Sequence, residues 1–307
     1  MVDISMGFID DPQSDAEPSR AGVRFSYSRP EHPFLTRSVI RAIEFISGQP
    51  RLARLYRRWA AEDKAGETLF AAGLRLLRIR LEIDEAAWST IPREGPLLLI
   101  ANHPFGVVDG LLMGYIATSL RRDVRIMTHS LLCQPPELQD YILPVDFGGT
   151  EAARQTTLDT RRRAVDWLRD GHALVVFPSG SVSTAQKPFS GPALESVWAP
   201  FVAKLATLPD VTTIPVYVHG RNSRLFQIAS HLHYALRIAL LFRETRRLTG
   251  RTVRATIGSP VDAATLRTLP DRSSILADLR RRTLSMAGPS GPDPEETFVW
   301  PSHIRWD

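Results

Sequence analysis

Residues 97–110 read LLLIANHPFGVVDG, and this stretch decides how the chain is interpreted. Its apolar beginning, residues 97–100, predicts a buried strand. The proline and the glycine that follow predict a turn, and a helix is expected to begin near Val107 or Asp109. Because a helix rotates by about 100° per residue, His103 and Asp109 cannot meet on one uninterrupted helix. The predicted turn, with the histidine on a loop and the aspartate in the first helical turn, allows them to meet.

A histidine beside an aspartate can act as a general base. The carboxylate of Asp109 would hold the proton of one ring nitrogen of His103, which leaves the other nitrogen free to take a proton from a hydroxyl group. A purely structural interpretation stands beside this one, in which Asp109 lies near a helix N-cap and His103 is an ordinary loop residue. One histidine and one aspartate do not decide between the two.

The segment 102–110, NHPFGVVDG, resembles the first motif of the glycerolipid acyltransferase superfamily, which includes the 1-acylglycerol-3-phosphate acyltransferases. The usual form of that motif is Asn-His, four residues, Asp, whereas this chain has five residues between His103 and Asp109. The longer form is similar to a bacterial branch described as hemolysin-like or lysophospholipid acyltransferases. Lyso-ornithine lipid acyltransferases are relatives of the same kind.

Three further segments follow in the order that the superfamily shows. Residues 176–183, VFPSGSVS, resemble its Phe-Pro-Glu-Gly-Thr motif, and residues 214–216, IPV, resemble its late Val-Pro-Val motif. Residues 143–146, LPVD, lie where its second motif is expected. The resemblance covers roughly residues 90 to 260 and rests on the order of the motifs as much as on any one of them.

Two departures from the superfamily pattern concern the acceptor. Ser179 stands where the third motif carries a glutamate, and no arginine directly follows Asp146, where the second motif carries a phosphate-binding one. The next arginine is Arg154. Two possibilities remain open: a phosphate held by another arginine or by the backbone amides of Gly148 and Gly149, or a lyso-aminolipid with a different head group.

The resemblance implies acyl transfer from a thioester, acyl-CoA or acyl carrier protein, to the hydroxyl of a lysolipid, without a bound cofactor. His103 would be the base and Asp109 its orienting carboxylate, with backbone amides near Gly180 as donors to the carbonyl oxygen. The histidines show no metal-ligand spacing, so we expect no metal. The candidate substrate-binding residues are Asn102, Gly106, Gly148, Gly149, Arg154, Ser179, Gly180, Ser181, Lys187 and Asn222.

Two of these candidates have structural alternatives. Lys187 would pair with an anionic acceptor or with the phosphates of CoA, or else be ordinary surface charge. Asn222 would line the acceptor pocket or cap a helix.

Strands and helices are expected to alternate, which predicts an α/β fold: a mixed, largely parallel sheet flanked by helices, with an N-terminal helical segment. We expect four regions: a disordered tail over 1–28, a helical segment and candidate membrane contact over 29–82, the acyltransferase domain over 83–287 and a C-terminal tail over 288–307. The predicted strands are 80–83, 97–101, 124–128, 142–145, 173–177, 212–218 and 252–257. The predicted helices are 34–46, 51–61, 68–78, 109–120, 136–141, 151–169, 194–207, 223–247 and 274–285.

Charge and hydropathy indicate the surroundings of the protein. The 307-residue chain carries a net charge of +5, and its arginines cluster at 51–58, 121–122, 161–163, 243–247 and 280–282. No nucleic-acid-binding module accompanies this charge, so an anionic membrane surface is the expected partner. Leu52, Leu55, Tyr56 and Trp59 form an apolar stripe that would face either the lipid or the protein core.

The expected location is the cytoplasm, with the protein peripheral on the inner face of the cytoplasmic membrane. The sequence contains no apolar run of about 18 residues and no signal-peptide pattern. Its single cysteine, Cys133, excludes an internal disulfide.

Two other functions fit the same residues. A lipid-directed hydrolase or thioesterase would use the His–Asp pair to activate water. A non-catalytic lipid-binding protein would keep the fold, although it has no need of the pair.

Overall fold

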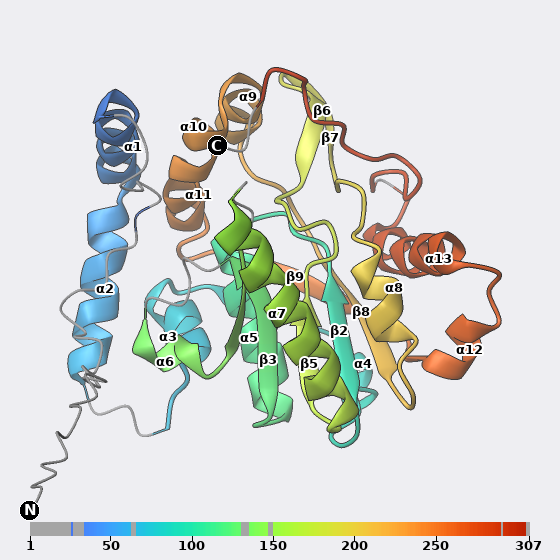
Figure 1. The fold of residues 1–307 in the computed structure, drawn as a ribbon. Helices are drawn as coiled ribbons and strands as arrows, with labels where there is room; N and C mark the ends of the chain where they lie inside the picture. The colour runs from blue at the N-terminus through green and yellow to red at the C-terminus, as the bar shows by residue number, and fades with distance from the viewer. Residues whose placement is uncertain are drawn as a thin grey trace, which may run out of the picture.

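The computed structural model describes residues 26, 34–62, 66–129, 135–146, 150–289 and 291–304. Cys133, both glycines at 148–149 and nearly all of the predicted N-terminal tail lie outside these residues. A central sheet of eight strands dominates the described part of the chain (Figure 1). Its strands are β1 (Arg80–Glu82), β2 (Leu97–Ala101), β3 (Val124–His129), β4 (Ile142–Val145), β5 (Ala173–Val176), β8 (Thr212–Val218), β9 (Thr252–Ile257) and β10 (Val261–Asp262).

The sheet is mixed and largely parallel, as the sequence predicted. The strand order is β1-β9-β8-β2-β5-β3-β4, and β10 pairs with β8. The pairs β8–β9 and β8–β10 are antiparallel, and the remaining pairs are parallel. Because β2, β3, β4 and β5 are parallel, the loops after them meet at one edge of the sheet, which is where such sheets place their sites.

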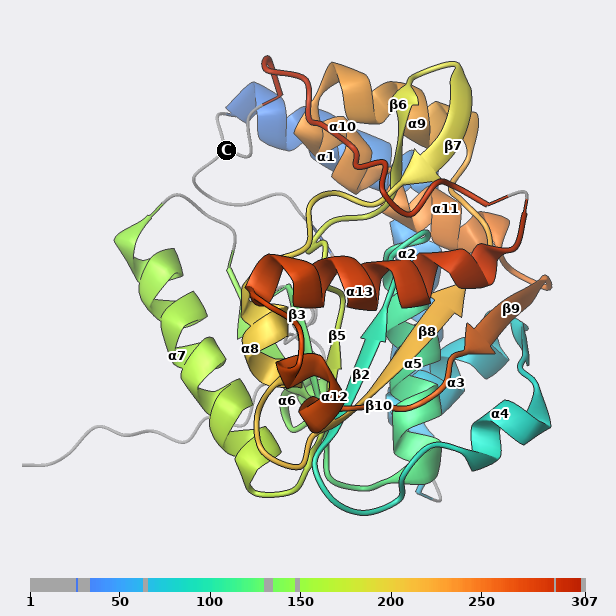
Figure 2. The same cartoon turned by 90° about the vertical axis from the view of Figure 1, so that its right-hand side faces the viewer.

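β2 is apolar throughout because helices cover both faces of the sheet. Leu97 and Leu99 pack in a core with α5 (Val107–Leu120), whereas Leu98 and Ile100 pack on the opposite face. That second core contains residues of α7 (Glu151–Arg169), α8 (Phe201–Ala206), α12 (Ala263–Arg267) and α13 (Arg272–Leu284). Figure 2 shows α8, α12 and α13 in front of the sheet and α5 behind it.

The N-terminal helices are α1 (Phe34–Ser47), α2 (Gln49–Ala61) and α3 (Leu69–Leu76). They lie beside α5 and two later helices, α10 (Tyr234–Ala239) and α11 (Leu241–Arg247). The apolar stripe of α2 faces the protein, since Tyr56 and Trp59 are buried. For this helix, the interpretation in which the stripe faces the protein core therefore holds. Among the described residues, no helix combines the length and the apolar character that crossing a bilayer requires.

Two predicted helices are wrong. The helix expected over 194–207 begins only at Phe201: Leu194 ends a strand, β7 (Ser190–Leu194), that pairs with β6 (Thr184–Lys187), and residues 195–200 form a connecting loop. The helix expected over 223–247 is divided into α9 (Arg224–Leu232), α10 (Tyr234–Ala239) and α11 (Leu241–Arg247). His233 breaks it with extended backbone at φ −162°.

Short elements that the sequence did not reveal are α4 (Glu85–Ser89), β10, α12 and a 3-10 turn, η3 (Ser285–Ala287). The helix α6 (Pro136–Gln139) is close to its prediction.

Candidate active site

The loop that carries His103 begins where β2 ends and is tied to the neighbouring strand. The side chain of Asn102 donates from Nδ2 to the carbonyl oxygen of Val218 at 2.9 Å, and its Oδ1 accepts from the Val218 N–H at 2.6 Å. Both amide atoms are thereby used, and Asn102 is buried. Its side chain fixes the start of the loop in this structure; contact with a substrate stays a prediction.

Asp109 lies both at the N-terminal cap of α5 and beside the histidine, and the role of His103 as a base stays a prediction. Its carboxylate is fully buried, and Oδ2 accepts from the N–H groups of Phe105 and Gly106 at 2.7 and 2.8 Å. The same oxygen lies 2.9 Å from Nδ1 of His103. Gly106 precedes the helix at φ +83°, a conformation that favours glycine.

The contact between His103 and Asp109 is short but not aligned as a hydrogen bond: among the described residues, Nδ1 has no partner of hydrogen-bond geometry. Catalytic hydrogen bonds are often poorly aligned without substrate and tighten in the complex. The imidazole also stacks on Phe177, with ring centroids 4.3 Å apart. Nδ1 is thus directed at the carboxylate, and Nε2 lies on the far side of the ring, where it is available to a substrate.

A second carboxylate holds the loop, and sequence reasoning missed it. Oε1 of the buried Glu195 accepts from the backbone N–H of His103 at 3.0 Å and from the hydroxyl of Ser183. The Ser183 N–H in turn donates to the carbonyl oxygen of His103 at 2.8 Å. Glu195 follows β7 and falls in the span 194–207 that was predicted as helix, so no local signal in the sequence indicated that it lies close to the motif.

Glu195 is itself held by its surroundings. The buried guanidinium of Arg280 donates to the carbonyl oxygens of Glu195 and Ser196 at 3.3 and 3.1 Å. Burial, together with the charge of Glu195, raises the pKa of the nearby Tyr217 to about 12, so this phenol stays protonated at neutral pH.

His103 opens onto a cavity of about 200 Å³. Its walls are mostly apolar and come from the ends of β3 and β5 and from α8, α10 and α11; they include Met127, Val176, Val202, Ile238 and Leu241. Polar groups at the wall include Thr157 and Arg161 of α7. A narrow apolar space beside a base suits a hydrocarbon chain whose reactive end lies at the imidazole.

The structure brings some of the predicted site residues to this cavity. Gly106, Gly180 and Ser181 line it. The Gly180 N–H, however, donates to the Phe177 carbonyl oxygen at 3.0 Å, so it is not a free oxyanion donor. Ser179 does not line the cavity within the described chain; its hydroxyl donates to the Ser181 carbonyl oxygen at 2.9 Å and closes the turn.

Other predicted residues lie elsewhere. Arg154 is exposed on α7 and pairs with Glu151 at 3.4 Å. Lys187 is exposed on the β6–β7 hairpin. Within the described chain, neither residue lines the cavity. Asn222 is buried, and its side-chain amide has no partner among the described residues; Ser223, not Asn222, caps α9. Gly148 and Gly149 lie outside the residues described.

Two arginines at the cavity were not singled out as site residues. Arg161 carries its guanidinium over the ring of Phe201, 5.4 Å from the centroid, and none of the described carboxylates is recorded as its partner. Burial lowers the pKa of Arg237 to about 10, and this side chain donates to neutral acceptors such as Ser230 Oγ at 2.8 Å. The exposed Arg161 is free to meet a ligand, whereas Arg237 is committed to the fold.

A half-buried histidine beside a buried aspartate, at the carboxyl edge of a largely parallel sheet and open to an apolar cavity, has the geometry that base-assisted transfer to a hydroxyl requires. The family model described as Acyltransferase matches residues 83–283, and the chain belongs to this family. It is therefore an acyltransferase, and the resemblance to glycerolipid acyltransferases is confirmed at the level of the superfamily; the narrower bacterial branch stays a prediction.

Two curated relatives carry the same name, lyso-glycine lipid O-acyltransferase. The protein from Phocaeicola vulgatus is 25% identical over 252 residues, which cover 79% of this chain and 83% of that one. The protein from Bacteroides thetaiotaomicron is 25% identical over 210 residues, or 66% and 73% of the two chains. A solved structure that matches is that of PlsC, the 1-acyl-sn-glycerophosphate (LPA) acyltransferase from Thermotoga maritima. Its sequence identity to this chain is 15% and the TM-score is 0.44; the match covers 81% of this chain and 78% of that chain. So distant a structural likeness supports no assignment of residues or substrates.

Proposed function

We propose that this acyltransferase moves a fatty acyl group from a thioester, acyl-CoA or acyl carrier protein, to the hydroxyl of a lysolipid. The observation that supports it most is the placement of His103, held by Asp109 behind it, at the mouth of an apolar cavity. The acceptors that fit are lysophosphatidic acid and lyso-aminolipids such as lyso-ornithine lipid, and the names of the two curated relatives favour the second kind.

The proposed reaction begins with proton transfer. Nε2 of His103 takes the proton of the acceptor hydroxyl while its oxygen attacks the thioester carbonyl carbon. The tetrahedral intermediate collapses, the carbon–sulfur bond breaks, and the thiolate leaves with the electron pair. The imidazolium returns the proton to the sulfur. Asp109 stabilises the imidazolium in between, and no acyl-enzyme is required.

Two parts of the cavity would assist this reaction. The apolar wall would hold the acyl chain. Negative charge that develops on the carbonyl oxygen needs a fixed donor, and the N–H of Ser181 is the candidate left by the turn, because the preceding amide of Gly180 is already used.

Arg161 is our candidate for the anionic part of the acceptor, since it lines the cavity and no described carboxylate is recorded beside it. We predict that Arg161→Gln raises KM for an anionic lysolipid about tenfold with little change in kcat, because a charged hydrogen bond is worth about 1.5–3 kcal/mol. Arg162→Gln is the matched control, since Arg162 pairs with Asp159 at 3.2 Å on the same helix. Equal effects of both changes would contradict the assignment.

We further propose that the enzyme works at the inner face of the cytoplasmic membrane, as a peripheral protein. Support comes from Phe34 and Phe45 of α1, whose side chains are largely exposed on a helix that also carries Arg37 and Arg41. Apolar side chains flanked by arginines suit the interface of an anionic bilayer.

Product analysis tests the activity itself. The purified protein would be incubated with one lysolipid and one acyl donor at a time. The lysolipids are lysophosphatidic acid, lyso-ornithine lipid and lyso-glycine lipid, and the donors are acyl-CoA and acylated acyl carrier protein. The products would be identified by mass spectrometry. We expect one lysolipid to gain an acyl group. Release of free fatty acid without transfer would show a hydrolase, and an unconsumed donor throughout would show a binding protein; either result refutes the proposal.

A further inference from the structure

A second hollow lies between the N-terminal helices and α11, and we call it the basic groove. It has a volume of about 730 Å³, within the range of ligand-binding clefts. Its apolar wall includes Leu52 and Leu55 of α2, Leu76 of α3 and Leu240. Its charged lining consists of Arg51, Arg78, Arg243, Arg246 and Arg247. Leu240 lines this groove, whereas its neighbour Leu241 lines the active-site cavity.

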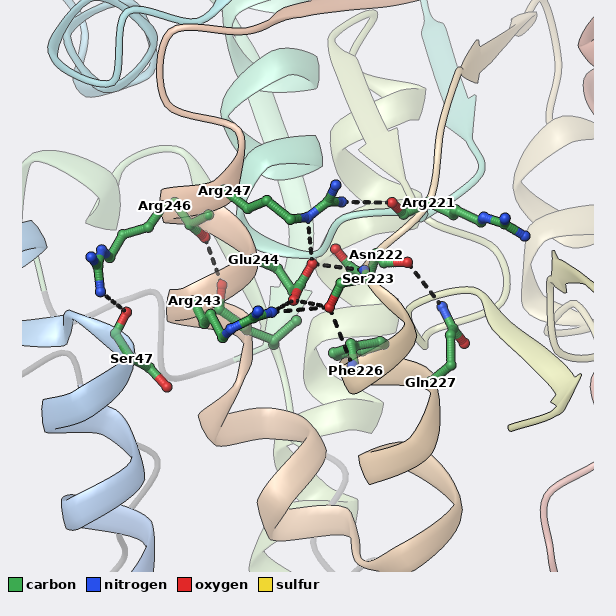
Figure 3. A network of polar contacts seen from close by, with 12 residues as sticks. Ser47, Arg221, Asn222, Ser223, Phe226, Gln227, Arg243, Glu244, Arg246 and Arg247 are labelled. Atoms are coloured by element: carbon green, nitrogen blue, oxygen red, sulfur yellow. Dashed lines mark hydrogen bonds and ion pairs between the residues drawn. The ribbon is translucent and has the colours of Figure 1, made fainter. Parts of the chain in front are cut away.

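Three of these arginines are held by the protein, as Figure 3 shows. Arg243 and Arg247 reach the fully buried carboxylate of Glu244 at 2.8 and 2.9 Å. That carboxylate also accepts from the N–H and the hydroxyl of Ser223 at 2.8 and 2.6 Å. Arg246 reaches the carbonyl oxygen of Ser47 at 3.3 Å, a neutral acceptor. Glu244 therefore offsets one charge of the groove, and within the described ranges no other carboxylate is paired with its arginines.

The other two arginines, Arg51 and Arg78, have no hydrogen-bond or ion-pair partner recorded within the described part of the chain, and both are exposed. Arg78 is also unusual in its backbone. It follows the C-cap of α3 at φ +52°, and the Ile79 N–H donates to the Leu74 carbonyl oxygen at 2.9 Å. This is the position after a helix where glycine is usual. The chain keeps an arginine there in spite of the backbone strain.

We propose that the basic groove binds one molecule of an anionic phospholipid. The uncompensated guanidinium groups would bind the phosphodiester, since guanidinium matches the geometry of phosphate oxygens and is weakly hydrated. The leucine wall would cover part of the acyl chains. A zwitterionic lipid offers no net charge to the arginines, and a free phosphate ion offers nothing to the leucines, so both should bind more weakly.

The position of Arg78 allows a test that separates binding from folding. Arg78→Gly removes the charge and places glycine in the conformation that suits it, so we expect an unchanged or higher Tm. Binding of dihexanoylphosphatidylglycerol, kept below its micellar concentration, would be measured by calorimetry. We expect the affinity of the variant to be lower than that of the unchanged protein by about tenfold. Arg58→Gln is the control: it removes one charge from an exposed site of α2 that does not line the groove.

Dihexanoylphosphatidylcholine and inorganic phosphate complete the experiment. We expect each to bind at least about tenfold more weakly than the anionic lipid. The proposal is overturned if the two lipids bind alike, if phosphate alone binds as tightly, if Arg78→Gly binds as the unchanged protein does, or if Arg58→Gln loses as much affinity. All of these readouts are binding measurements, so their failure leaves the proposed acyl transfer untouched.

Discussion

His103 and Asp109 meet because the chain reverses between them at a glycine. A Cβ added at Gly106 would lie 2.9 Å from a methyl carbon of Leu241, so the turn is fixed by packing as well as by its φ of +83°. The sequence predicted the pair and the turn, because both are local. It did not predict Glu195, which lies 92 positions from His103 and reaches it only through the hairpin.

Glu195 acts on catalysis through the loop that it holds, so it is a positioning residue. We predict that Glu195→Ala lowers kcat about 100-fold, because small displacements of a catalytic group cost this much. KM for the acyl donor should change little, since the residue does not line the cavity. Glu195→Gln, which keeps an oxygen for the His103 N–H, should restore most of kcat.

The measurement is steady-state kinetics on protein whose fold has been verified by circular dichroism. A Glu195→Ala variant with unchanged kcat, or an equal loss in the glutamine variant, would refute the positioning role.

Strands were easier to predict than the helices of the second half. The predicted spans 97–101, 142–145, 212–218 and 252–257 agree with β2, β4, β8 and β9. Short apolar runs indicate buried strands such as β2, whereas exposed and buried residues alternate along β9. The hairpin β6–β7 was missed because its residues form strands only by pairing with each other, and β7 contains a glycine and a proline. Tertiary pairing overrode the local pattern there.

Arg121 joins three elements at the edge of the sheet opposite the site. Its guanidinium donates to the carbonyl oxygens of Gly95 and Gly171, the second at 2.8 Å, and to Asp123, whose Oδ1 lies 2.9 Å from Nε. We predict that Arg121→Ala lowers the free energy of unfolding by about 2–3 kcal/mol, measured by urea denaturation. Arg122→Ala, a change at an exposed neighbour, should cost less than about 0.5 kcal/mol. Equal costs would contradict the assignment.

The same cluster predicts a pH dependence. Burial acts to raise the pKa of Asp123, but hydrogen bonds from Arg121 and His172 outweigh it and lower the pKa below its usual 3.8. A carboxyl group whose pKa is lowered on folding stabilises the protein at pH values above its pKa in the unfolded state. This stability is lost as the pH falls through its pKa in the folded state. Below about pH 4 the unchanged protein should therefore lose stability more steeply than Arg121→Ala. Parallel losses in acid denaturation would refute this.

In the described part of the chain, the eight-stranded sheet is accompanied by N-terminal helices, of which α1 carries exposed apolar side chains. The sequence predicted helices there and a candidate membrane contact over 29–82, and it left open whether the stripe of α2 faces lipid or the core; the stripe packs inward. The exposed residues belong to α1: Phe34 is 75% exposed and Phe45 is 71% exposed. Periodicity identifies a stripe but not what covers it, since core and membrane both accept apolar side chains.

We predict that the double change Phe34→Ser, Phe45→Ser lowers binding to anionic vesicles about tenfold, because each phenylalanine would bury apolar area in the interface. Turnover of short-chain substrates in solution should be unchanged, as neither residue lines the cavity. Leu158→Ser, at an exposed leucine of α7, is the control. Vesicle sedimentation gives the measurement, and unaltered binding of the double variant would contradict membrane docking through α1.

The chain contains its own control for the central claim, because His172 and Asp123 form a second His–Asp pair, with Nδ1 and Oδ2 3.1 Å apart. This pair precedes β5 and β3, at the edge of the sheet opposite the cavity. The decisive measurement is acyl transfer to a lysolipid by His103→Ala and by His172→Ala, each verified to be folded. We predict a loss of about 100-fold to 10,000-fold for His103→Ala and near-normal turnover for His172→Ala. Retained turnover in His103→Ala would contradict the account.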